Sequence, residues 1–312
     1  MSKNQTWTIG EIIKQVREEK KITILQLSRG LCSPATLSRI EADKREMDMM
    51  MASILFERLG YNLDKFEFYG SQEECEQYDK RLSIQKHKES KEFEKMEQEL
   101  LEYQAEIGEN ASPLHEQFIK KMWGFLAFQT GDYERAIQFF EEAIRLTVPD
   151  WQGEWEKLTI LSLTELEILQ LLADVYSRTG REEEAYTIRC SILEYLDKQN
   201  ECREQFAELY TNIACKVLPR LVEKGEFQKG VFLCEKGIEI LSAIVRMYSW
   251  PDLLYWKGVC LEKLLESGEV SEKEVIAAYK EAYYIYRLFS QNETAEKIKI
   301  HLEENYQWEF IG

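Results

Sequence analysis

Residues 22–46 hold the start and end signals of two short helices, and this stretch constrains the fold more than any other part of the chain. Thr23 can cap a first helix, and Gln26 three residues later completes a capping box. Gly30 then ends that helix. Ser33, followed by a proline, is a strong start for the second helix, because its hydroxyl can accept a backbone N–H and proline suits the first helical position. The stretch therefore predicts a helix-turn-helix.

The second helix offers a face that suits nucleic acid. Leu37 and Ile40 lie three residues apart and mark its inner side, which leaves small and hydroxyl-bearing side chains outside. Between Lys14 and Arg45 eight basic residues stand against four acidic ones, so positive charge is concentrated here. Such a face can approach base edges and phosphates. The side chains that we expect at this interface are Arg17, Thr23, Arg29, Ser33, Ala35, Thr36, Ser38, Arg39, Lys44 and Arg45.

These residues closely resemble the Xre-type helix-turn-helix of phage repressors. The family pattern has an arginine in the first helix, a threonine and a leucine at the second, and S-x-x-T-[IL]-S-R-[IL]-E in the recognition helix. It is met by Arg17, by Thr23 with Leu27, and by residues 33–41. The resemblance implies a five-helix DNA-binding domain over residues 1–68, in which Arg39 within the recognition helix contacts a base or a phosphate.

Two positions depart from the family pattern. Ile24 stands where relatives usually have a glutamine that contacts DNA. The E-x-G-K turn that follows the recognition helix reads EADK over residues 41–44 and lacks its glycine. These departures leave open a helix-turn-helix that is retained for packing or dimerisation alone.

The net charge of −17 belongs to the rest of the chain. Residues 1–70 hold 11 basic and 10 acidic side chains, whereas residues 71–312 hold 29 and 47. An acidic body repels phosphate, so any DNA must be bound by the first 68 residues. Seven scattered cysteines without a C-x-x-C pair favour reduced thiols, and no apolar run reaches the length of a membrane span. We therefore expect a soluble, cytoplasmic protein with no membrane partner.

Short glycine-containing turns recur beyond this domain and indicate a helical repeat. They lie around Gly131, Gly180, Gly225 and Gly268, at intervals of 49, 45 and 43 residues, so each unit holds two helices and a variable connection. No β pattern of any length is found. The units resemble tetratricopeptide repeats, whose small residues let neighbouring helices stack closely. The resemblance implies an all-α fold in which residues 69–312 form a right-handed superhelix of degenerate repeats.

Two details of the repeats follow from single residues and local pattern. Pro219 falls where one helix should continue, which predicts a kink or a break there. Residues 281–306 predict one final helix that caps the array.

The chain shows no signature of catalysis. The three histidines, His87, His115 and His301, are isolated from one another and from cysteines at ligand spacing, so we expect no metal site. There is no phosphate loop, nucleophile elbow or kinase signature, and the acidic pairs fall on turns and helix surfaces. We therefore expect neither an enzyme nor a cofactor.

A helix-turn-helix followed by degenerate tetratricopeptide repeats resembles the RNPP and Rgg groups of peptide-sensing regulators in Gram-positive bacteria. The resemblance implies a homodimeric transcription regulator that binds an inverted repeat in double-stranded DNA and a short signalling peptide in the concave groove. Inward asparagines hold the peptide main chain in these relatives; Asn212 matches best, with Gln170 as a substituted equivalent. Counting from the turn glycines places the groove positions at Lys121, Phe125, Gln170, Asp174, Arg178, Asn212 and Tyr255.

Three alternatives stay open at this point. Either amide can be a surface or helix-packing residue instead of a ligand contact. The chain can be an interaction scaffold whose repeats bind another protein, or a repressor that needs no ligand and fills its groove with its own side chains.

Overall fold

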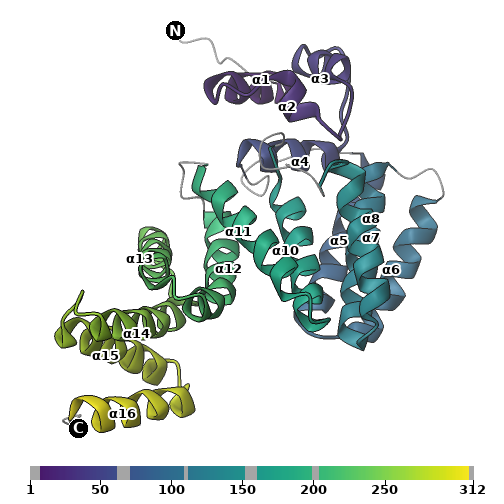
Figure 1. The fold of residues 1–312 in the computed structure, drawn as a ribbon. Helices are drawn as coiled ribbons and strands as arrows, with labels where there is room; N and C mark the ends of the chain where they lie inside the picture. The colour runs from purple at the N-terminus through teal and green to yellow at the C-terminus, as the bar shows by residue number, and fades with distance from the viewer. Residues whose placement is uncertain (1–7, 62–70, 109–111, 152–159, 199–203, 309–312) are drawn as a thin grey trace. The chain divides into compact units, whose positions relative to one another are not determined.

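The computed structural model describes residues 8–61, 71–108, 112–151, 160–198 and 204–308, and the regular structure within these ranges is helical throughout. The all-α prediction is therefore confirmed for this part of the chain (Figure 1). None of the described helices combines the length and the apolar character that crossing a bilayer requires. The chain divides into two compact units, residues 1–188 and residues 189–312.

The helices of the first unit are α1 (Ile9–Glu19), α2 (Ile24–Ser28), α3 (Pro34–Glu41), α4 (Met49–Leu59), α5 (Gln72–Glu89), α6 (Phe93–Ile107), α7 (Pro113–Thr130), α8 (Tyr133–Thr147) and α10 (Leu163–Arg178). Helix α11 (Glu182–Lys198) crosses the boundary between the units. The second unit continues with α12 (Glu204–Glu223), α13 (Phe227–Ala243), α14 (Trp250–Glu266), α15 (Glu272–Leu288) and α16 (Asn292–Tyr306).

Local sequence signals set the helix ends in the helix-turn-helix, which comprises α1 to α4. The Thr23 hydroxyl accepts from the Gln26 backbone N–H at 3.2 Å, and the Gln26 side chain accepts from the Thr23 N–H at 2.9 Å. Ser33 accepts from the backbone N–H three residues later at 3.1 Å. Both predicted caps are therefore confirmed. The predicted fifth helix and the domain boundary at residue 68 fall on residues 62–70, outside the described residues.

The core of this domain is built from the inward positions that the helical period marks. Its buried side chains are Ile13, Leu27, Leu37, Leu55, Phe56 and Leu59. Ile24, the departure from the family pattern, is half-buried and packs against this core. It therefore stabilises the domain from a position where relatives present a DNA-contacting amide.

The first repeats require small residues where their helices pack. In Figure 1, α7 and α8 run alongside each other as a hairpin, followed by α10. A Cβ on Gly124 would lie 2.7 Å from Cε1 of Phe140, closer than real Cβ atoms come to a neighbour. Close approach of α7 and α8 therefore depends on a glycine, as the repeat pattern predicts.

The buried apolar side chains that join α5, α6 and α7 are Ile84, Met96, Leu100, Tyr103, Phe118, Ile119, Met122 and Leu126.

The second unit keeps the same packing rule and corrects two predictions. A Cβ on Gly237 would lie 2.8 Å from a methyl of Leu253, so α13 and α14 also need a glycine. Helix α12 continues through Pro219, so a break at this residue is absent, and a kink there stays a prediction. Leu218 and Leu221 on either side of the proline are buried. The prediction of a single final helix over residues 281–306 is also wrong.

Two helices occupy that last segment. Helix α15 ends at Leu288, α16 begins at Asn292, and Ser290 between them has a positive φ of 59°. Neither glycine nor proline marks this turn, so the helical pattern in the sequence continues across it and predicts one helix where there are two.

Candidate nucleic-acid interface and ligand groove

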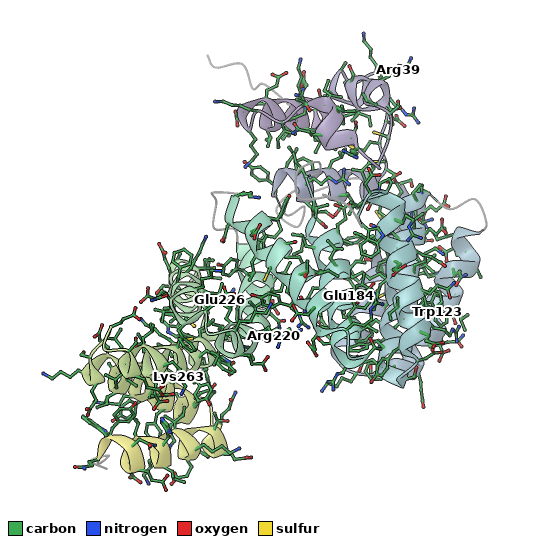
Figure 2. The ribbon with its side chains drawn as sticks, viewed as in Figure 1. Arg39, Trp123, Glu184, Arg220, Glu226 and Lys263 are labelled. Carbon is green, nitrogen blue, oxygen red and sulfur yellow. The ribbon has the colours of Figure 1, made fainter. Side chains whose placement is uncertain are left out.

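Helix α3 presents one polar face outward and anchors the other in the core. Leu37 and Ile40 are buried, whereas Ala35, Ser38 and Arg39 are exposed. Figure 2 shows Arg39 at the outer side of the helix-turn-helix domain. The Arg39 side chain has neither a hydrogen bond nor an ion pair within the described residues. Arg39 therefore lies on the outer face, as the sequence predicted, and its contact with DNA stays a prediction.

Arg17, which the sequence predicts at the DNA interface, lies inside the domain. Its side chain is buried, and Nε and Nη2 donate to the two carboxylate oxygens of Glu41 at 2.7 and 2.9 Å. Nη1 donates to the Ile22 carbonyl at 2.9 Å. The hydrogen bond to Glu41 raises the pKa of the guanidinium. Arg17 therefore joins α1 to the end of α3 from within, and nothing in its placement favours a phosphate contact.

The two capping hydroxyls and Thr36 serve the turn itself. The Thr23 hydroxyl donates to the Gln26 side chain at 2.9 Å in addition to its capping bond. The Ser33 and Thr36 hydroxyls lie 2.9 Å apart and share a hydrogen bond. Thr23 and Ser33 are exposed and Thr36 is half-buried, so each can reach a partner only at the edge of its helix.

The remaining predicted cations divide into two kinds. Arg29 pairs with Asp150, which follows α8 of the repeats, and its backbone carbonyl accepts from Arg58 at 2.6 Å. Lys44 and Arg45 follow α3, are exposed, and have no ionic partner within the described residues. With Arg39 they form an exposed cationic group on and beside α3.

A buried ion pair between α4 and α10 was not foreseen from the sequence. Arg58 and Glu165 are both fully buried, and Nη2 and Nε of the arginine donate to the carboxylate at 2.6 and 3.3 Å. Arg58 also donates to the carbonyls of Leu27, Arg29 and Thr147 at 3.1, 2.6 and 3.4 Å. One guanidinium thus satisfies carbonyls from the turn of the helix-turn-helix and from the end of α8. The only signal in the sequence was a single arginine inside an apolar helix.

The same contact region contains a close backbone approach and a perturbed carboxyl group. Gly30 has a φ of 73°, and a Cβ there would collide with the Thr147 carbonyl. Glu57 of α4 accepts from the Thr164 N–H at 3.1 Å. Burial raises the pKa of Glu57 to about 7. We call Gly30, Arg58, Thr147 and Glu165, together with Glu57, the joint.

The predicted groove residues of the first unit divide between α7 and α10. Lys121 is buried and forms an ion pair with Glu167, which links the two helices. Phe125 packs edge-to-face with Phe93, with 6.1 Å between ring centroids, and Lys88 Nζ lies 5.3 Å from the Phe125 ring. Burial lowers the pKa of Lys88. This part of the array therefore combines cations and aromatic rings at one place.

The other predictions for this unit follow α10. Gln170 is buried, and its amide donates to the Asp174 carboxylate at 2.8 Å. The Gln170 carbonyl oxygen is buried and has no hydrogen-bond partner in the described part of the chain. Arg178, two turns after Gln170, is exposed. An unsatisfied buried acceptor can bind a main-chain N–H, which is what peptide recognition requires.

In the second unit, Asn212 and Tyr255 have different surroundings. Asn212 is exposed on α12. Tyr255 is half-buried, and its ring packs against Trp256 and Tyr279 with centroids 5.6 and 6.0 Å apart. Whether these residues share one groove with those of the first unit stays a prediction. Within the described ranges no cluster of histidine, cysteine, aspartate and glutamate could hold a metal ion.

Comparison with protein-family models assigns both parts of the chain. Residues 13–66 match a helix-turn-helix model and residues 124–147 match a tetratricopeptide repeat. The chain is therefore a helix-turn-helix protein of the Xre type with tetratricopeptide-like repeats. Residues 154–308 match the RNPP family C-terminal domain, so the C-terminal half of the protein is an RNPP domain.

Solved structures share the fold at low sequence identity. PlcR of Bacillus thuringiensis in complex with the peptide PapR7 and DNA is 19% identical, over 93% of this chain and 98% of that one, with a TM-score of 0.50. Apo PlcR of Bacillus thuringiensis is 18% identical over 93% and 97%, with a TM-score of 0.53. The apo form of RapI is 12% identical over 74% and 77%, with a TM-score of 0.55. No curated protein sequence matches the chain.

Proposed function

We propose that the protein is a sequence-specific DNA-binding transcription regulator whose activity is set by a short peptide. The observation that carries the proposal is the exposed cationic group of Arg39, Lys44 and Arg45 on and beside the recognition helix α3. It stands in a chain whose remaining charge is strongly negative, so DNA has one suitable surface. PlcR, which shares the fold, has been crystallised with both a peptide and DNA.

In this proposal, residues 1–68 read the DNA and residues 69–312 bind the peptide and dimerise. A homodimer would place two copies of α3 in successive major grooves, about one helical turn apart on an inverted repeat. Arg39 reads a base or a phosphate, with Ala35 and Ser38 beside it. The protein acts in the cytoplasm, by binding and without catalysis or a cofactor.

The peptide would occupy the side of the array that Lys121, Phe125, Gln170 and Asp174 line in the first unit. The unsatisfied Gln170 carbonyl supports this site, because a peptide N–H would complete its hydrogen bonding. A peptide can change DNA binding only if it binds two states of the protein with different affinity. The joint supports such coupling, because α10 carries both Gln170 and the Glu165 partner of Arg58.

The first experiment selects genomic DNA fragments with purified wild-type protein and with Arg39→Ala. We expect the wild type to enrich an inverted repeat. The variant should lose about 1–3 kcal/mol of discrimination at that site, because one arginine contact to a base edge contributes this much. The matched control is Arg135→Ala, which removes an exposed arginine from α8.

Two outcomes would contradict the DNA proposal or the role of Arg39. Equal enrichment by wild type and Arg39→Ala removes the arginine from base reading. No enrichment of any sequence, together with co-purification of a stable protein partner, favours the interaction scaffold.

The peptide site is tested with labelled synthetic peptides encoded beside the enriched DNA sites. Gln170→Ala and Asn212→Ala should each raise the dissociation constant about 10-fold, because each removes one or two hydrogen bonds to the peptide main chain. Gln138→Ala is the control, since Gln138 is exposed and bonds to Glu142 of its own helix. Binding that is insensitive to both groove variants would place the peptide elsewhere.

A further inference from the structure

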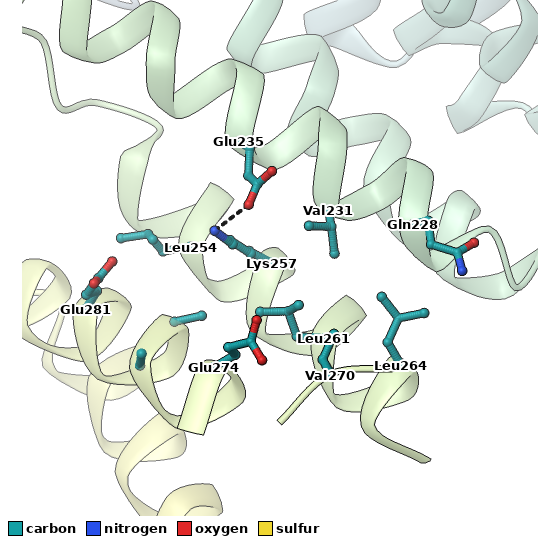
Figure 3. A pocket seen from close by; sticks show the side chains of 12 residues that line it. Gln228, Val231, Glu235, Leu254, Lys257, Leu261, Leu264, Val270, Glu274 and Glu281 are labelled. Carbon is teal, nitrogen blue, oxygen red and sulfur yellow. Dashed lines mark ion pairs between the residues drawn. The ribbon is translucent and has the colours of Figure 1, made fainter. Parts of the chain in front are cut away.

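A pocket of about 380 Å³ lies between three helices of the second unit, α13, α14 and α15. Figure 3 shows Val231, Leu261, Leu264 and Val270 around its floor. Carboxylates lie around this apolar floor. The complete lining is Gln228, Val231, Glu235, Leu254, Lys257, Leu261, Leu264, Val270, Glu274, Ala277, Ala278 and Glu281. None of these residues belongs to the DNA-reading surface or to the predicted peptide positions.

The rim of the pocket carries more negative than positive charge. Three of its residues are glutamates and one is a lysine. Lys257 pairs with Glu235 at 2.8 Å, and the Glu274 carboxylate accepts hydrogen bonds from Ser271, which lower the pKa of Glu274. Glu281 has no ion pair within the described residues. Glu274 and Glu281 of α15 therefore present exposed carboxyl groups at the rim of the pocket.

The apolar surface continues from the pocket along α15. Ala277, Glu281, Tyr284 and Leu288 follow spacings of four, three and four residues, which place them on one face of the helix. Tyr284 and Leu288 are 51% and 76% exposed, and Phe232, which follows the lining residue Val231 in α13, is 63% exposed. From Glu274 to Leu288 this face spans about 21 Å, since each helical residue rises about 1.5 Å. Exposed apolar side chains in such a row mark an interaction surface.

We propose that the groove between α13 and α15 docks an amphipathic helix of a partner protein, with apolar side chains in the pocket and lysines or arginines along its margin. An apolar helix face about four turns long matches the roughly 21 Å of this face of α15. Cations at its edges would meet the exposed carboxyl groups of Glu274 and Glu281, while Lys257 pairs with Glu235. This surface is separate from DNA reading and peptide binding, so the regulator can contact a further protein while both are occupied.

A second copy of the chain that presented the same groove would be a poor occupant. Such a symmetric contact places the same residues opposite each other, so Glu274 and Glu281 of both copies would face like charges. Charge complementarity therefore favours a basic segment of a different protein.

The test measures the binding of two synthetic helical peptides to the full-length protein by fluorescence anisotropy. Both peptides place leucines on one helix face; one carries lysines at the margins and the other carries glutamates. We expect the lysine peptide to bind at least 10-fold more tightly than the glutamate peptide. Ala277→Arg fills the pocket mouth with a long cation and should weaken the lysine peptide at least 10-fold.

A matched pair of double variants separates a local site from general attraction to an acidic protein. Glu274→Gln with Glu281→Lys removes one negative charge at the rim and reverses the other, and glutamine can retain the capping box of α15. Glu94→Lys with Glu97→Gln makes the same change in net charge on the exposed face of α6. The rim variant should weaken the lysine peptide about 10-fold, whereas the α6 variant should leave it within 2-fold of wild type.

Three results would overturn the proposal. Equal affinity for the two peptides would show that charge complementarity does not determine binding. Equal weakening by the two double variants would show that the peptide does not bind at this rim. Sedimentation that shows a wild-type dimer and an Ala277→Arg monomer would mean that a second copy covers the groove. Circular dichroism and retained DNA binding verify that each variant is folded.

Discussion

The inner and outer sides of the helix-turn-helix use the same residue type for opposite purposes. Inside, Arg17 and Arg58 are buried and each is held by a carboxylate, Glu41 or Glu165. Outside, Arg39 is exposed and has no such partner within the described residues. The family motif includes Arg17 and Arg39 alike, and only burial separates the arginine that holds the domain together from the one that is exposed to a partner.

The largest expected effect comes from breaking the joint. Arg58→Ala should lower the free energy of unfolding by about 3–5 kcal/mol, because it leaves Glu165 buried without its partner and three carbonyls without a donor. Urea denaturation measures this change. The control is Arg58→Met with Glu165→Gln, which removes both charges, can retain the α10 capping box and should cost less than the single variant. A loss no larger than that of Arg135→Ala would contradict the structural role of Arg58.

Breaking the Arg17–Glu41 pair should lower the free energy of unfolding less than breaking the Arg58–Glu165 pair. Arg17→Met keeps most of the side-chain volume and leaves Glu41 without its two hydrogen bonds, so we expect a loss of about 2–3 kcal/mol. At a temperature where the variant is still folded, its DNA site preference should match that of the wild type. If instead stability is unchanged and DNA affinity falls, Arg17 acts in DNA binding and does not hold the domain together.

We expect pH to change the stability of the protein through Glu57 of the joint. Glu57 has a pKa raised to about 7 in the folded protein, above the value near 4.5 of an unperturbed glutamate, so the folded state keeps a proton that the unfolded state has released. Stability should therefore fall as the pH rises from about 5 to 8, by on the order of 1 kcal/mol after allowance for partial exposure. Glu57→Gln should flatten this dependence in thermal melts. A dependence that persists in the variant would assign it to other groups.

The smallest effect concerns the two cations beside α3. Lys44→Ala or Arg45→Ala should each lower the slope of log affinity against log salt by about 1, because each removes one phosphate contact. The preference among DNA sequences and the stability should not change. The measurement is DNA binding at several salt concentrations, with Arg135→Ala as the control. A changed sequence preference would mean that the residue reads a base.

Local structure could be predicted from the sequence because its causes are local. Thr23 and Ser33 cap their helices through bonds to residues three positions away, and the turn glycines of the repeats recur at readable intervals. The Arg58–Glu165 pair joins residues 107 positions apart, and no pattern within one sequence connects them. The buried position of Arg17 could not be predicted for the same reason, since its partner Glu41 is 24 residues away.

The site predictions differ in how far the structure supports them. Arg39, Lys44 and Arg45 are exposed as expected, because polar positions on a short helix and the turn after it leave few alternatives. Lys121 and Gln170 are buried, and their side chains bond to Glu167 and Asp174. Counting from turn glycines places residues on a helix face, but it cannot say which of them bond to each other.

The joint bears on how the protein can be divided. The helix-turn-helix ends near residue 68 by family pattern, yet Arg58 and Gly30 fit against residues of α8 and α10. A fragment cut at that point would lose the Glu165 carboxylate and the Thr147 carbonyl, and it would expose a guanidinium that is buried in the full chain. The helix-turn-helix therefore cannot be transferred alone without losing these contacts. A chimera that joins it to another sensor domain would also have to contain Glu165 and Thr147.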